Sequence, residues 1–90
     1  MTITDIVDYL ITLPKRLRIR KECAELVKKC EQKHAHIEDE RERAKWVLEN
    51  FKRHCYEEIW RRHSNDCLTI FEEERSRTIN QLAKVIFSEK

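Results

Sequence analysis

Four cysteines are the residues of this chain best suited to chemistry. Cys23 and Cys30 enclose six residues, and Cys55 and Cys67 enclose eleven. An even number of cysteines in a small domain is typical of two disulfide bonds, which persist in oxidising compartments. The spacing therefore predicts a disulfide-stapled domain, and the redox compartment becomes a first indication of function.

Helix geometry limits which of these cysteines can pair. Two helical residues seven apart are separated by ~10.5 Å along the axis, whereas a disulfide needs Cα atoms within ~7 Å of each other. A Cys23–Cys30 bridge is therefore excluded while that segment is helical. An antiparallel helix pair allows Cys23 to bond Cys67 and Cys30 to bond Cys55, which is the pairing we favour. A second scheme bridges Cys55 to Cys67 across a reversal near residues 61–64 and needs a bend between the first two cysteines.

Two alternatives to disulfides stay open. Cys30 and His34 are four residues apart, as are His63 and Cys67, so each pair lies on one helix face and the four could form a zinc site. Short cysteine spacings such as C-x2-C are absent, so we predict no metal. Free cysteines could also serve as small core residues. No phosphate-binding loop and no nucleophile–base pair is visible, so we expect no enzyme, no cofactor and no small-molecule substrate.

The composition predicts one all-α domain over residues 1–90. The chain has no glycine and one proline, which argues against the tight turns that a sheet needs. Charged residues make up 40% of the chain, so little apolar surface is left for a core. We therefore expect antiparallel helices that are long, polar and extended rather than a globular bundle.

The expected elements are a short helix and a long helical region. The short helix covers about residues 5–13 and is capped by Asp5. It ends before Pro14, because proline cannot continue the hydrogen-bond pattern of a helix. The region of about 14–63 keeps a helical pattern, and whether it is one helix or reverses near 36–42 stays open.

A break at Ser64-Asn65-Asp66 precedes a C-terminal helix of about residues 66–88, because these side chains favour caps and turns. Apolar residues at three- and four-residue spacing mark the expected buried faces. They are Ile6, Tyr9, Leu10 and Leu13; Ile19, Cys23, Leu26, Cys30 and Ile37; Leu48, Phe51, Cys55 and Ile59; and Leu68, Phe71, Ile79, Leu82 and Ile86, with Arg75 interrupting the last set.

Other features bear on partners and location. Trp46 and Trp60 flank the third apolar set, where tryptophan commonly packs on a partner protein. The formal net charge of +2 gives no case for nucleic-acid binding. No apolar run approaches the ~20 residues of a membrane span. The first residues show neither a secretory signal nor an arginine-rich mitochondrial presequence.

The cysteine spacing resembles that of a known family. A C-x6-C pair, a long charged helix and a C-x11-C pair are similar to the PDSW-type accessory subunit of mitochondrial respiratory complex I. The resemblance covers roughly Ile19 to Arg75, including Glu22-Cys23 and Asn65-Asp66-Cys67. It implies a non-catalytic subunit that braces the membrane arm from the intermembrane-space side of the mitochondrial inner membrane. Its partners would be other protein subunits of that large membrane complex, and the four cysteines would be oxidised.

Two further functions stay open. The run Phe71-Glu72-Glu73-Glu74-Arg75-Ser76-Arg77 resembles the last long helix of BAR-type domains, which dimerise and bind lipid. That resemblance implies a membrane-binding scaffold. The chain could also be a helical accessory subunit of another organellar complex.

Overall fold

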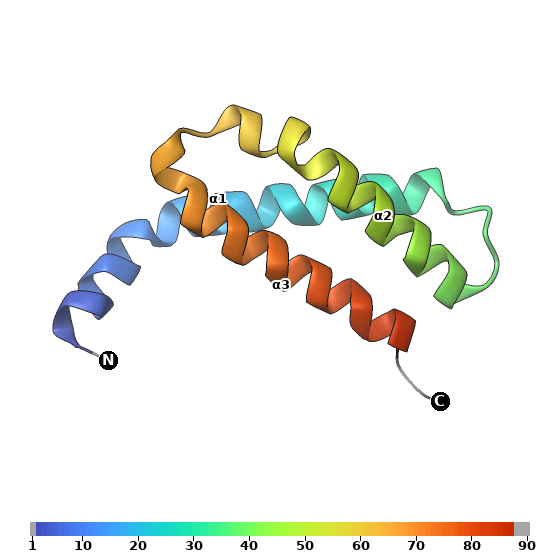
Figure 1. Ribbon diagram of the computed structural model, residues 1–90, viewed down its shortest axis with the longest axis horizontal. Helices are drawn as coiled ribbons and strands as arrows, with labels where there is room; N and C mark the ends of the chain where they lie inside the picture. Colours follow the sequence, from blue (N-terminus) through green and yellow to red (C-terminus); the bar gives the residue numbers. More distant parts are fainter. Residues whose placement is uncertain (1, 88–90) are drawn as a thin grey trace.

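The protein is all-α, as predicted. The computed structural model describes residues 2–87, and within them it contains helices and no strand (Figure 1). The elements are α1 (Ile3–Lys33), α2 (Glu40–Glu58), the short 3-10 helices η1 (Trp60–Arg62) and η2 (Asn65–Cys67), and α3 (Leu68–Phe87).

Helix α1 is longer than predicted and continues through Pro14. Its N-cap is Thr2 rather than Asp5: the Asp5 N–H donates to Thr2 Oγ1 at 3.3 Å, and the Thr2 N–H donates to Asp5 Oδ2 at 3.2 Å. The predicted boundary at Pro14 is wrong, because this reciprocal cap holds the first turns and packing from Ile19 onward holds the rest. Proline still removes one backbone donor, and α1 changes direction near it, between its dark blue start and its cyan remainder (Figure 1).

The long helical region predicted for residues 14–63 reverses once, at residues 34–39. His34 ends α1, and Asp39 caps α2 by accepting a hydrogen bond from the Arg41 N–H at 3.0 Å. Arg43 Nη1 also donates to the carbonyl of Ile37 at 2.7 Å, which ties the loop to the first turn of α2. The sequence left open whether residues 14–63 form one helix or reverse, and the structure shows a reversal, with the Asp39 cap at the start of the second helix.

The second reversal lies where the sequence predicts it. Helix α2 ends at Glu58, and extended backbone at Ser64 leads into η2 and then α3. The side chains of Ser64 and Asp66 are hydrogen-bonded to each other, and Lys15 Nζ donates to Asp66 Oδ2 at 3.2 Å. The turn is thereby fastened to α1. The predicted helix end at residue 88 lies outside the described residues.

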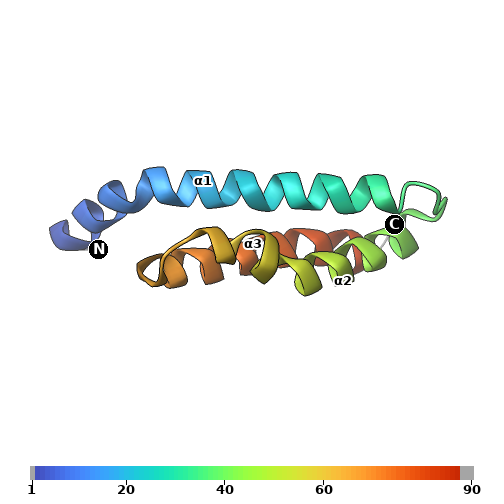
Figure 2. The same cartoon turned by 90° about the horizontal axis from the view of Figure 1, so that it is seen from above.

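Helices α2 and α3 lie side by side in one layer, and α1 covers that layer (Figures 1 and 2). Each of the three packs on the other two, and the molecule measures 47 × 30 × 15 Å. Most of the buried apolar residues form one cluster: Ile19, Cys23, Leu26, Cys30, Val47, Phe51, Cys55, Ile59, Cys67, Ile70 and Phe71.

The predicted buried faces are confirmed for most residues from Ile19 onward. In α2, Phe51 and Cys55 are buried as predicted, and so is the C-cap Ile59, but Val47 is buried in place of Leu48, which is only half-buried. In α3, Phe71 and Ile86 are buried, and Ile79 and Leu82 pack against the core, as predicted. The predicted Leu68 of α3 is exposed.

Candidate interaction surface

The four cysteines are core residues in this structure. All are buried and free, and no two lie at disulfide distance. The predicted staple, with Cys23 bonded to Cys67 and Cys30 to Cys55, is therefore not formed. Cys55 Sγ lies beside Arg75 of α3, and Cys67 follows Asp66, which is paired with Lys15, eight residues before Cys23 in α1.

Burial makes these thiols poor nucleophiles. Desolvation raises the pKa of Cys23 to about 11, and it also raises the pKa of Cys30. Arg75 Nε donates to Cys55 Sγ at 3.2 Å, and that thiol in turn donates to the Lys52 carbonyl at 3.6 Å. Since the thiolate is the reactive form, these contacts indicate packing rather than catalysis.

The alternative zinc set is not brought together. It consists of Cys30, His34, His63 and Cys67. The ring of His34 stacks on Trp46 with centroids 5.7 Å apart and is hydrogen-bonded to Asn50. His63 Nε2 is hydrogen-bonded to Glu22 Oε2 at 2.8 Å, across from α1. Across residues 2–87, no three or more His, Cys, Asp or Glu side chains are grouped so that they could hold a metal ion.

The two tryptophans lie in different environments. Trp46 is 50% exposed, so its outer surface is accessible to a partner. Trp60 is partly buried and packs on Phe71 with ring centroids 5.4 Å apart. Only Trp46 therefore presents much of its surface to solvent.

A buried carboxylate joins α1 to α3, which the sequence did not predict. Glu74 is 2% exposed and accepts hydrogen bonds from Arg20 Nε at 3.0 Å and Nη2 at 2.9 Å, and from Arg16 Nη1 at 3.3 Å. The Arg20 hydrogen bonds are the main reason that the pKa of Glu74 is lowered, against the cost of burial. The sequence held a signal for this contact, because Arg16 and Arg20 are four residues apart and Glu74 follows the apolar Phe71 by three residues. The arrangement is a structural tie, because the carboxylate is enclosed and already paired.

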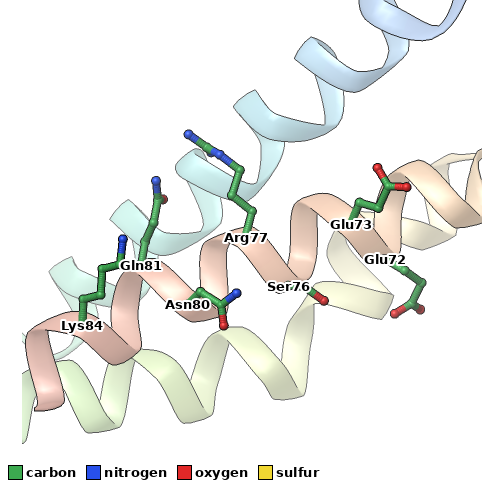
Figure 3. A pocket seen from close by; sticks show the side chains of 7 residues that line it. All are labelled: Glu72, Glu73, Ser76, Arg77, Asn80, Gln81 and Lys84. Carbon is green, nitrogen blue, oxygen red and sulfur yellow. The ribbon is translucent and has the colours of Figure 1, made fainter. Parts of the chain in front are cut away.

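The outer face of α3 carries an open groove of about 630 Å³. It is lined by Glu72, Glu73, Ser76, Arg77, Asn80, Gln81 and Lys84. Their side chains spread along the helix and point in different directions rather than toward a common centre (Figure 3). Such an arrangement is typical of a solvated face rather than of a binding site.

Seven of the twelve exposed large apolar residues among residues 2–87 lie on the first half of α1. We call residues 3–17 the arm. Nine of its positions are apolar, and all but Leu13 are exposed. These positions are Ile3, Ile6, Val7, Tyr9, Leu10, Ile11, Leu13, Pro14 and Leu17.

The apolar side of the arm faces away from the rest of the molecule. At about 100° per residue, its nine apolar positions span roughly 200° of the helix surface. Their centre lies roughly opposite the face that carries Ile19, Cys23, Leu26 and Cys30, which packs on α2 and α3. The start of the arm also extends past the end of the α2–α3 layer (Figure 2). The expected face of Ile6, Tyr9, Leu10 and Leu13 therefore exists but is not covered within this chain.

No protein-family model, curated protein or solved structure matches the chain. Within residues 2–87, no helix combines the length and the apolar character needed to cross a bilayer.

Proposed function

We propose that this chain is a non-catalytic helical assembly protein that binds another protein through the arm. The observation that carries the proposal is the exposure of a contiguous apolar surface on residues 3–17. Monomeric soluble proteins rarely leave such a patch open, and those that do mostly use it as an interaction site.

The contrast within α1 supports this proposal. From Ile19 to Cys30 the helix follows the usual pattern, with apolar residues inside and charged residues outside. In the arm the apolar residues are outside, and because most of them are about half exposed, burying one aliphatic side chain would contribute roughly half of the 1.5–3 kcal/mol that full burial gives. Burial of this surface against another protein chain would therefore favour association.

Native electrophoresis of the tagged chain, extracted from cells of its source, tests the proposal. We expect the wild type to migrate in a complex rather than as a single copy, and Leu10→Glu to migrate free. Leu10 is 59% exposed and glutamate is a good helix former, so the fold is retained. Phe87→Glu, at a residue 78% exposed on α3, is the matched control and stays in the complex. Identical migration of the wild type and Leu10→Glu would contradict the proposal.

A narrower candidate is an accessory subunit of respiratory complex I on the intermembrane-space side of the inner membrane. It is favoured by the C-x6-C and C-x11-C spacing. In this structure the thiols are free and none is at disulfide distance from another, so the candidate requires a rearrangement that brings the thiols together before they are oxidised.

Intact mass of the native protein, with and without reductant, tests this candidate. A mass lower by four protons, together with co-migration with complex I after mitochondrial import, would support it. Four alkylatable thiols in protein recovered from mitochondria would contradict it.

The BAR-type alternative is less well supported. The arm could insert its apolar side into a membrane interface, but Asp5 and Asp8 offset the attraction of Lys15 and Arg16 for anionic lipids. Co-sedimentation and tubulation of phosphatidylserine-containing liposomes, lost in Leu10→Glu, would favour the BAR-type function over the protein partner.

A further inference from the structure

We propose that the partner of the arm is the arm of a second copy, paired antiparallel about a two-fold axis that passes near Leu10. This inference rests on the proposed function and specifies its partner.

The polarity pattern of the arm is self-complementary. The segment 3–17 reads ITDIVDYLITLPKRL, and its apolar and polar positions follow the same order from either end. A position i is mirrored by position 20 − i, so Ile3 corresponds to Leu17, Val7 to Leu13, and Leu10 to itself. A two-fold interface requires that the same patch on both copies be complementary to itself. This pattern fulfils that requirement for antiparallel helices.

Charge selects the antiparallel over the parallel orientation. Residues 2–8 carry Asp5 and Asp8, whereas residues 12–18 carry Lys15, Arg16 and Arg18. Antiparallel pairing places the acidic half of each arm alongside the basic half of the other, an attraction that salt should weaken. The side chains of Lys15 and Arg18 remain 54% and 77% exposed, so they can act across the pair. Parallel pairing would place like charges together.

The arm is sterically open to a second copy. Its apolar side lies roughly opposite the face that packs on α2 and α3, and its start extends beyond that layer (Figure 2). Two arms can therefore approach side by side while both helical layers stay outside the contact.

The size of the apolar surface sets the expected affinity of the dimer. Nine apolar positions per copy are fewer than the ~20–30 residues a side of a standard stable interface. We therefore expect a reversible dimer with a dissociation constant on the order of micromolar.

Purified full-length protein tests the dimer by light scattering coupled to size exclusion, over a range of concentrations. We expect the wild type and Phe87→Glu to shift from monomer to dimer together. Leu10→Glu places two like charges at the two-fold axis and should weaken association on the order of 100-fold. Circular dichroism verifies that each variant is folded. A wild type that stays monomeric into the high micromolar range would overturn the inference, and so would unchanged dimerisation of Leu10→Glu.

Cysteine crosslinking tests the orientation, with the wild type as control because its four thiols are buried. Under mild oxidation, Leu10→Cys should crosslink to itself. A mixture of Ile3→Cys and Leu17→Cys should give heterodimers, whereas either variant alone should give few crosslinks. Strong self-crosslinking of Ile3→Cys would indicate a parallel pair and overturn the inference.

The two proposals fail differently. A monomeric purified protein that still migrates in a large complex in cells, and loses it with Leu10→Glu, overturns the homodimer and leaves the assembly function standing. A chain that stays free in cells while the purified protein dimerises overturns the assembly function and leaves the homodimer standing.

Discussion

At the scale of single residues, buried polar side chains define how α1 is held. Glu74 is enclosed, and its two arginine partners come from α1, 58 and 54 positions away in the sequence. A buried carboxylate without its partners would be costly, so this group depends on correct docking of α1. Cys23 is enclosed as well, but it contributes as a small protonated core residue.

The Glu74 tie predicts a specific dependence of stability on pH. Its pKa is lowered from 4.5 in the folded state, so its contribution is present above about pH 4.5 and is lost as the pH falls through the lower folded value. We expect Glu74→Gln to reduce the free energy of unfolding at neutral pH by ~2–3 kcal/mol, at the low end for a buried pair because Arg20 is partly exposed. The difference from wild type should narrow at acid pH.

Urea denaturation at pH 7 and at acid pH measures this effect. Glu73→Gln is the control, because Glu73 also contacts Arg16, at 2.8 Å, but is 52% exposed. It should cost less than 1 kcal/mol. Equal losses in the free energy of unfolding for the two variants would show that the burial of Glu74 does not determine how strongly its ion pairs stabilise the fold.

At the scale of elements, side-chain caps mark where α1 and α2 begin. The loop at residues 34–39 lies within a stretch that is helical by propensity, and Asp39 sets the start of α2 there. The cap therefore stabilises the reversal that folds α2 back on α1.

Removal of that cap should destabilise the whole fold. Asp39→Ala should lower the free energy of unfolding by about 1 kcal/mol, because the Arg41 N–H loses its acceptor. Glu38→Ala, at the exposed neighbouring residue, is the matched control and should change stability by a few tenths of a kcal/mol. A thermal melt followed by circular dichroism compares the two, and equal midpoints would contradict the role of the cap.

The elements also show what the sequence could and could not predict. The spacing of Ile19, Cys23, Leu26 and Cys30 located the buried face of α1, because burial follows the helical period there. The boundary at Pro14 was mispredicted, since a long helix tolerates one missing donor when both sides are held. Cysteine spacing did not fix which thiols are neighbours, because that depends on the register of α2 against α1. The apolar face of the arm was visible in the sequence, but its exposure depends on where α2 and α3 end.

At the scale of the whole molecule, the chain divides into a packed layer and an unpacked arm. The core holds α1, α2 and α3 together from Ile19 onward, whereas residues 3–11 are all exposed. The apolar residues of the arm therefore contribute little to folding and are available for association. Both proposals rest on this division of α1 into a segment that packs in the core and a segment that is exposed.

The most direct measurement of this division is amide hydrogen exchange of the purified protein, followed by mass spectrometry from about 1 µM to about 100 µM. The account predicts fast exchange in residues 3–14 at low concentration and marked slowing at high concentration, while residues 19–30 exchange slowly throughout. Exchange in the arm that does not change with concentration, or slowing confined to α2 and α3, would contradict the account.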